Sequence, residues 1–427
     1  MKIPALQKPT FPVNHLIPWL IVILGLKILG FFTLSENITI TRGLKILIRM
    51  ACTGTTAFLI FHYQAKGYAA NFRQSNSLVF WGYCTYLLLA LFSFLWSTDV
   101  AYSALQWFMD TETFIFSMLF IRLILLVNQY AGEHEIRLSD LLSRAVFLLM
   151  AWNILGAWFF PDTFYRLTHG QEVARLGGFL MNPNELGMLA VVGIAASYLE
   201  LFQAKKNHYW DYFRIACALY ALILTGSRSS IIGFLLVSYY AINLTNNRWF
   251  RWVVIGALLL SIPIIVQFIF IKEGDLKEVL SMTGRLPFWK ALLTEGFPKQ
   301  PWLGFGFMRI SNEGFFQSVN TYAGKMTHNT FIQVLMNLGI IGFFICLSQL
   351  ALTLYACIRS TSSRKKRFFT AVFIPILINS FTEFGIFGET NYGILFYQLL
   401  FLIFVIEVSP HFSQKQLRKI QQLSEKK

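Results

Sequence analysis

Charged residues are scarce in this sequence. They make up 13% of its 427 residues, against roughly 25% in a soluble domain. So few charges cannot cover the surface of a water-exposed globule, and a soluble fold is therefore excluded. Instead, 56% of the residues are hydrophobic, and they recur in runs close to the ~20 residues that cross a bilayer as a helix. The sequence predicts an all-α polytopic membrane protein, with residues 1–427 forming a single membrane-embedded domain.

Cysteine is also rare, and its placement excludes two kinds of scaffold. Five cysteines lie scattered within apolar stretches. An odd, dispersed set argues against a disulfide framework and against a metal cluster. We interpret the cysteines as small packing residues.

The hydrophobic runs predict about twelve membrane-spanning helices. Residues 1–14 precede the first run without a small-residue cleavage site, so that run is expected to remain as the first span. The predicted spans lie near residues 17–34, 44–63, 78–97, 106–127, 141–160, 184–203, 210–225, 229–245, 250–271, 330–357, 367–384 and 391–408.

Basic residues predict the orientation of these spans, because Lys and Arg accumulate in cytoplasmic loops. With the N-terminus inside, the basic cluster at residues 359–367 and the basic tail at 411–427 both fall in the cytoplasm. The tail is expected either to lie on anionic lipid or to be solvated. The net charge of +15 then belongs to the cytoplasmic side of a membrane protein, and no nucleic acid partner is expected. The outer face receives a loop at 161–183 and a long loop at 272–327, which is expected to carry short helices.

Three short polar clusters interrupt the apolar pattern, and the predicted topology places all of them on the outer face. Each cluster begins a helix that runs inward, and such helix N-termini attract anions. Arg228 adds a guanidinium suited to phosphate, and Arg285 of the long loop adds another. Together with His328, these features predict a pyrophosphate site with a base beside it. The clusters are Gly177–Glu185, Leu224–Ser230 and Thr327–Thr330.

Each of these residues taken alone also has a simpler interpretation. Arg228 could extend to lipid headgroups, and Arg285 could be a solvated loop charge. His328 could be a cap or a packed interfacial residue, while Asn182 and Glu185 could serve as capping residues. Their joint occurrence on one side favours the site.

Other polar residues in the apolar segments are candidates for binding. Lys45 and Arg49 lie one helical turn apart in the outer part of the second span, where they could hold a diphosphate, another acidic ligand or lipid headgroups. Asp110 and Glu112 lie near the outer end of the fourth span, and Lys27 is a possible partner, since buried acids require one. The expected binding residues are Asn182, Asn184, Glu185, Asn329, Arg175, Lys45, Arg49 and Trp289.

These motifs resemble the O-antigen ligase and polymerase superfamily, the bacterial membrane glycosyltransferases that use polyprenyl-diphosphate-linked glycans. The resemblance extends from the third predicted span to the tenth. It is carried by Phe92–Ser97, Asn182–Asn184, Thr225–Arg228, Gly284 and Arg285 with Trp289, Pro301–Gly306, and His328 with Asn329.

The most specific part of the resemblance is a ligase-type pattern around the histidine. The pattern is His, then Asn, Ser or Gln, nine residues, Gly, two residues, and Gly, Thr or Tyr. His328 and Asn329 with Gly339 and Gly342 fit it. A companion ligase pattern, Arg with Leu four positions on, is met only approximately, because Ile232 follows Arg228. The polymerase-type spacing of Arg, ten residues and Gly is met by Arg285 with Gly296 and by Arg166 with Gly177.

The resemblance implies an inverting glycosyl transfer on the periplasmic side of a bacterial inner membrane, with both termini in the cytoplasm. An acceptor hydroxyl would attack the anomeric carbon of a polyprenyl-diphosphate-linked glycan. Arg228 and Arg285 would stabilise the leaving diphosphate, and His328 would accept the proton. Among the expected substrate-binding residues, Arg175 would line the acceptor entrance, and Trp289 would stack on sugar or anchor at the membrane interface. No Asp-x-Asp pair is present, so we expect no metal and no cofactor.

Alternative functions remain open at this point. A ligase would use a lipid A-core or similar acceptor, whereas a polymerase would use another lipid-linked repeat unit, and the histidine pattern slightly favours a ligase. A transporter or lipid-linked glycan flippase is the rival of another class. Such proteins place polar sites near the membrane midplane within repeated halves, so polar clusters at one face favour an enzyme.

Overall fold

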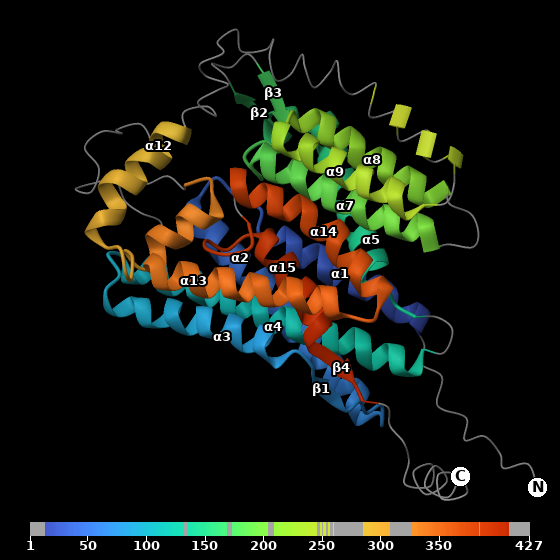
Figure 1. The fold of residues 1–427 in the computed structure, drawn as a ribbon. Coiled ribbons are helices and arrows are strands. Elements are labelled where there is room, and N and C mark those ends of the chain that lie inside the picture. The colour runs from blue at the N-terminus through green and yellow to red at the C-terminus, as the bar shows by residue number, and fades with distance from the viewer. Residues whose placement is uncertain are drawn as a thin grey trace, which may run out of the picture.

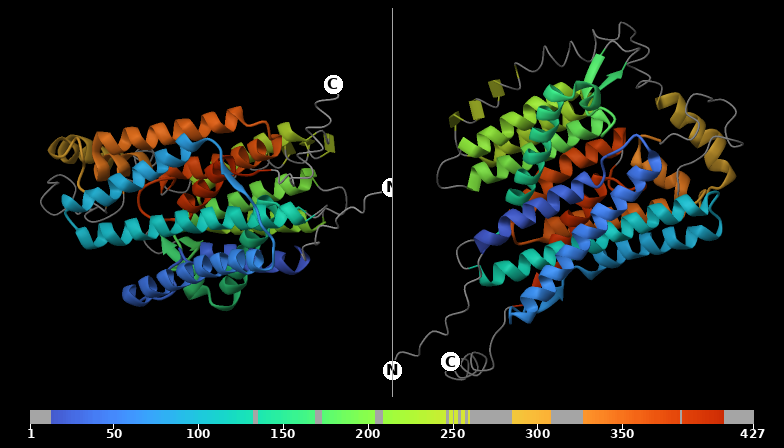
Figure 2. Two further views of the ribbon diagram at one scale, coloured as in Figure 1. Left: turned by 90° about the horizontal axis from the view of Figure 1, so that it is seen from below. Right: turned by 180° about the vertical axis from the view of Figure 1, so that it is seen from behind.

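The described part of the protein is a helical bundle with almost no sheet (Figure 1). The structure is a computed structural model that describes residues 13–131, 135–168, 173–203, 209–245, 285–307, 327–383 and 385–409, together with 248, 249, 251, 252, 255, 256 and 259. Long helices lie side by side in it, as two further views show (Figure 2).

The elements follow one another with short connections between most of them. The helices are α1 (Val13–Leu29), α2 (Ile38–Ala65), α3 (Ser77–Phe92), α4 (Val100–Tyr130), α5 (Leu138–Phe159), α6 (Pro161–Phe164), α7 (Pro183–Gln203), α8 (Tyr209–Thr225), α9 (Arg228–Leu244), α12 (Arg285–Ala291), α13 (Thr330–Arg359), α14 (Ser363–Thr382) and α15 (Tyr392–Val405). Shorter turns are η1 (Ser93–Leu95), η3 (Leu292–Gly296) and η4 (Phe297–Lys299), and the strands are β1 (Phe72–Gln74), β2 (Tyr165–Thr168), β3 (Val173–Leu176) and β4 (Ile406–Val408).

Each predicted span except 250–271 coincides with one of these helices, and 250–271 falls largely outside the described residues. Among the described residues, five helices are long and apolar enough to cross a membrane: Ile38–Ala65, Ser77–Leu95, Leu138–Phe159, Pro183–Phe202 and Thr330–Arg359. Two further apolar helices are shorter, His15–Leu29 and Tyr392–Val405. An all-α membrane-type fold is therefore observed, whereas the count of about twelve spans stays a prediction.

Parts of the two predicted polar segments can also be compared with the structure. Within the long loop at 272–327, residues 285–307 contain α12, η3 and η4, and most of the remainder lies outside the described residues. The tail at 411–427 lies outside them as well.

Side-chain caps explain where several helices begin. Asn37, Asn329 and Asn391 each accept hydrogen bonds through the side-chain oxygen from two backbone N–H groups of the following helix. Ser227 and Ser362 cap α9 and α14 in the same way, each with one such bond. These residue types satisfy N–H groups that have no partner within the helix, so the local sequence determines the helix starts.

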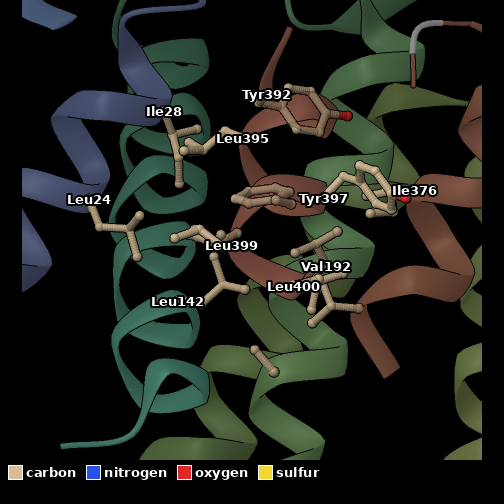
Figure 3. Packing of buried hydrophobic residues seen from close by; sticks show 14 of the residues in the cluster. Leu24, Ile28, Leu142, Val192, Ile376, Tyr392, Leu395, Tyr397, Leu399 and Leu400 are labelled. Atoms are coloured by element: carbon tan, nitrogen blue, oxygen red, sulfur yellow. The ribbon is translucent and has the colours of Figure 1, made fainter. Parts of the chain in front are cut away.

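Helix α15 forms the centre of the bundle. Nearly all of its side chains are buried, and it packs against α3, α4, α13 and α14. Figure 3 shows Leu395 of α15 beside Ile28 of α1, and Leu400 beside Val192 of α7. A helix that is apolar all round belongs in the core, as the sequence of α15 requires.

A buried ion cluster joins the first helices of the bundle. The Lys27 Nζ and Glu112 Oε1 atoms are 2.5 Å apart, and Arg49 Nε lies 3.2 Å from Glu112 Oε2. All three side chains are at most 4% exposed. Charges at such depth require partners, so this cluster links α1, α2 and α4. The predicted partnership of Lys27 with an acidic residue of the fourth span is confirmed.

The two ends of the bundle differ in character. At one end, β1 pairs antiparallel with β4, and Arg364 pairs with Glu135. At the other end lies α12, beside the start of α13 (Figure 1). The polar residues considered next are close to this second end.

Candidate functional site

A buried glutamate faces the predicted catalytic histidine. The Nδ1 atom of His328 lies 2.7 Å from Oε2 of Glu383, the residue that follows α14. Glu383 is 0% exposed and His328 is 24% exposed. A carboxylate on Nδ1 favours the tautomer that carries its proton there, which makes Nε2 the nitrogen able to accept a proton. The pair therefore has the geometry of an oriented general base.

The other oxygen of Glu383 is also engaged. Its Oε1 atom accepts a hydrogen bond from Arg285 Nη2 at 2.5 Å and one from Asn184 Nδ2 at 2.8 Å. Burial by itself would raise the pKa of Glu383, but the hydrogen bond and charge of His328, the charge of Arg285 and the Asn184 amide together lower this pKa to about 2. Glu383 is therefore an anion at neutral pH.

The backbone at His328 is held in an uncommon conformation. Its φ is +51°, in the left-handed region that side chains other than glycine seldom adopt. Asn329 caps α13 directly afterwards, and the Trp289 indole donates to the Thr327 carbonyl at 2.6 Å. Contacts on both sides of the histidine thus stabilise a strained residue, and such strain clusters at functional sites.

Arg285 is held in place by its own short helix. It begins α12, which packs through Phe288 against Met336 of α13 in a small hydrophobic cluster separate from the main core. The guanidinium donates to the Thr382 carbonyl as well as to Glu383. Trp289 packs against the same cluster, so α12 connects Arg285 to the helix that His328 precedes.

A kink in α13 brings together two more sequence stretches that carry the resemblance, Gly339 and Pro301–Gly306. Gly339 has φ +63° within the helix, and the segment Pro301–Gly306 fills the break. Phe305 N donates to the Met336 carbonyl at 2.9 Å, and Ile340 N donates to the Pro301 carbonyl at 2.8 Å. A Cβ on Gly339 would lie 2.2 Å from the Trp302 carbonyl oxygen, so only glycine allows this approach. The kink sets the direction of the first turns of α13, which follow His328.

The first two polar clusters meet beside Glu383. Helix α8 ends at Thr225, Gly226 turns the chain at φ +57°, and α9 begins at Arg228. The Arg175 Nε atom donates to the Thr225 carbonyl at 2.7 Å, and its Nη2 atom donates to Asn184 Oδ1 at 2.6 Å. Since Asn184 contacts Glu383 and Glu383 contacts His328, hydrogen bonds join residues of all three clusters. Arg228 is half-buried at the start of α9.

The remaining predicted binding residues lie at the starts of helices or within α2. Asn182 accepts from the Asn184 backbone N–H at 3.0 Å and so caps α7. Glu185 is half-buried in the first turn of α7, and Lys45 is half-buried in α2. Arg49, by contrast, is 1% exposed and bound to Glu112.

Glu383 lies at the centre of the site, although no sequence motif predicts it. An isolated carboxylate at the outer end of a predicted span was the available signal, because such a group requires a partner. The described residues contain no group of three or more His, Cys, Asp or Glu side chains that could hold a metal ion, and metal independence stays a prediction.

One segment of the chain matches a known protein family. Residues 213–347 match the family model described as O-antigen ligase. This range includes Arg228, Arg285, His328 and Gly339, while Asn184 and Glu383 lie outside it. The match supports the O-antigen ligase superfamily, so the resemblance predicted from the motifs is confirmed. No curated protein matches the chain.

Proposed function

On the premise of its O-antigen ligase family domain, we propose that this protein is a membrane glycosyltransferase of the ligase type. It moves a glycan from polyprenyl diphosphate to a lipid A-core or similar acceptor, with inversion at the anomeric carbon. The observation that carries the proposal is the His328–Glu383 pair, with Arg285 bound to the same carboxylate. A base and a cation that share one buried anion suit a reaction that removes a proton and releases a phosphate.

The proposed reaction uses the second nitrogen of the histidine. The acceptor hydroxyl oxygen attacks the anomeric carbon, and its proton passes to Nε2 of His328. The bond between the anomeric carbon and the diphosphate oxygen breaks at the same time, and the carrier lipid leaves as its diphosphate anion. Glu383, held as an anion, stabilises the imidazolium that forms, as a buried carboxylate does for other catalytic histidines.

Cationic groups near the pair suit the charge of the leaving diphosphate. Arg285 lies 2.5 Å from Glu383 and its side chain is 19% exposed, so part of the side chain is accessible. Arg228 occupies the first position of α9, where the helix dipole adds positive potential. Donors that are already in position when charge develops commonly contribute a factor of about 10²–10³ each to the rate.

The proposed side of the membrane follows from the opposite end of the bundle. Two basic residues lie there in ion pairs: Arg364, of the basic cluster predicted to be cytoplasmic, with Glu135, and Arg137 with Glu200. With those residues in the cytoplasm, the His328 end faces the periplasm of a bacterial inner membrane. A lipid-linked donor that has already crossed the bilayer is then the accessible substrate, whereas a cytosolic nucleotide sugar is not.

A reconstituted transfer assay tests this proposal. Purified protein in lipid vesicles is supplied with a glycan on polyprenyl diphosphate and with lipid A-core. Wild-type protein is expected to form glycosylated lipid A and to release polyprenyl diphosphate, while Arg228→Ala and Arg285→Lys reduce the rate. Arg359→Ala is a matched control, because Arg359 lies in the last turn of α13 at the other end. Movement of the donor across sealed vesicles without any new glycosidic bond would instead establish a flippase.

A polymerase is the second candidate. The observation in its favour is the polymerase-type spacing of Arg285 and Gly296. Arg285 is the first residue of α12, and Gly296 is the last residue of η3. The two activities leave different glycans after gene deletion. Long polymer left on the carrier lipid indicates a ligase, whereas single uncoupled repeat units indicate a polymerase.

A further inference from the structure

We infer that Arg175 is a positioning residue that acts through the Asn184 amide on the Glu383–His328 pair. Arg175 is predicted to line the acceptor entrance, and Asn184 is predicted to bind substrate. The observed hydrogen bonds connect Asn184 to the carboxylate and Arg175 to Asn184. This inference rests on the proposed function, because it concerns the base of the proposed reaction.

The Asn184 amide lies between a cation and an anion. Its Oδ1 accepts from Arg175 Nη2 at 2.6 Å, and its Nδ2 donates to Glu383 Oε1 at 2.8 Å. An amide can present either its oxygen or its nitrogen to a neighbour. Only one orientation suits Glu383, because an amide oxygen facing a carboxylate would be repelled.

Arg175 selects that orientation. A guanidinium has donors but no acceptor, so the Asn184 side chain must turn its oxygen towards Arg175 and its nitrogen towards Glu383. Without Arg175, only the contact of its nitrogen with the Glu383 carboxylate would hold the amide in this orientation. Charge-assisted hydrogen bonds of this kind are about twice as strong as neutral ones, so the arginine exerts a definite preference.

Arg175 is itself anchored to the turn between α8 and α9. Its Nε atom donates to the carbonyl of Thr225, the last residue of α8. The final carbonyls of a helix have no partner within it, and a basic side chain there also suits the helix dipole. The same turn leads to Arg228, the proposed diphosphate ligand. The Ser230 hydroxyl donates to the Asn184 carbonyl at 3.1 Å, which strengthens the connection.

The hydrogen bonds thus form one continuous series from Thr225 through Arg175, Asn184 and Glu383 to His328. It joins the donor side of the proposed site to its base. The series predicts that Arg175 affects turnover only while Asn184 is present to transmit the effect. A direct contact between Arg175 and substrate would predict an effect independent of Asn184.

A double-mutant cycle in the transfer assay distinguishes these cases. We expect Arg175→Ala and Asn184→Ala each to lower kcat about tenfold, the size expected for losing one charged hydrogen bond, with little change in KM for the donor. The double variant is expected to lose no more than either single variant. Arg175→Lys keeps a donor and should restore part of kcat. Arg73→Ala, which removes a 69% exposed arginine at the other end, is the matched control and should keep wild-type kinetics.

The possible outcomes separate the inference from the proposed function. The positioning role would be overturned if the losses in kcat multiplied in the double variant, or if Arg175→Ala changed only KM. In either case His328→Ala would still abolish transfer. A wild-type protein that forms no glycosidic bond with any lipid-linked donor would overturn the proposed function, and the inference with it. Thermal unfolding of each variant identifies a change in kcat that arises from loss of folded protein.

Discussion

The ring of His328 and the carboxylate of Glu383 lie 2.7 Å apart, although they are separated by 55 positions in the sequence. His328 precedes α13 and Glu383 follows α14, so the contact closes an antiparallel pair of helices at one end. It also orients the imidazole, because Nδ1 faces the carboxylate. The predictions below begin with this pair.

The first prediction concerns the histidine. His328→Ala should lower kcat by about 10²–10⁴, the usual contribution of a general base, because the acceptor proton then has no oriented acceptor. Binding of the lipid-linked donor should be retained, since Arg228 and Arg285 are unchanged. Turnover of the purified variant and donor binding to vesicles are the two measurements. Wild-type turnover would remove His328 from the mechanism.

The second prediction uses the charge of Glu383. Its pKa of about 2 lies below the ordinary 4.5, so the ionised carboxylate stabilises the folded protein. That contribution is complete above pH 4.5 and is lost as the pH falls through 2. The difference in Tm between wild type and Glu383→Gln should therefore shrink as the pH falls from 4.5 towards about 2. A difference that stays the same across this range would contradict the assignment.

The third prediction ranks substitutions in the buried ion cluster by how much each lowers the stability of the protein. Glu112→Gln leaves Lys27 and Arg49 without their shared anion, while Lys27→Met leaves Glu112 paired with Arg49. Breaking a buried pair costs about 3–5 kcal/mol, so Glu112→Gln should lower the stability by that amount and Lys27→Met by less. Arg144→Ala breaks the more exposed pair with Asp140 and should cost less than about 1 kcal/mol. Unfolding in detergent measures all three, and the reverse order would refute this account.

The fourth prediction tests the kink of α13. Gly339→Ala adds a Cβ 2.2 Å from the Trp302 carbonyl oxygen at a position with φ +63°, so the segment that fills the break must move. We expect a large drop in Tm together with loss of transfer. Gly54→Ala in α2 is the matched control, because its Cβ would meet no atom within 4 Å. A helical Gly→Ala change in open space should stabilise by about 0.5–1 kcal/mol. Equal behaviour of the two variants would show that the kink is dispensable.

The fifth prediction concerns metal ions. Since Arg228 and Arg285 are proposed to neutralise the diphosphate, transfer should be unchanged by excess chelator. The measurement is the initial rate of purified protein with and without chelator, followed by added magnesium. Activity that disappears with chelator and returns with magnesium would establish a metal requirement.

Much of the fold was predictable because the relevant signals are local. A run of apolar residues specifies a membrane-type helix wherever it lies, and Asn329 or Ser227 specifies a helix start by capping its own following residues. The predicted spans consequently coincide with helices wherever the structure describes them. Part of the site was predictable for the same reason. His328 and Arg285 lie in sequence patterns that can be recognised locally.

Other relationships were outside the reach of the sequence. Glu383 carries no motif, and its importance follows from His328, Arg285 and Asn184, which reach it from separate elements. Arg49 lies one helical turn from Lys45, yet it pairs with Glu112 of α4. Which side of α2 faces α4 depends on how the helices rotate and pack together, and a hydrophobic run does not encode that rotation.

The sequence by itself therefore determined that this protein is a helical membrane protein with polar helix starts and a histidine motif of the O-antigen ligase type. Only the tertiary structure decided which charges meet, with Glu383 between His328 and Arg285, and Arg175 bound to Asn184. The physical reason is one of range. Hydrophobicity and capping act within a few residues along the chain, whereas ion pairs form between side chains that helix packing brings within about 3 Å.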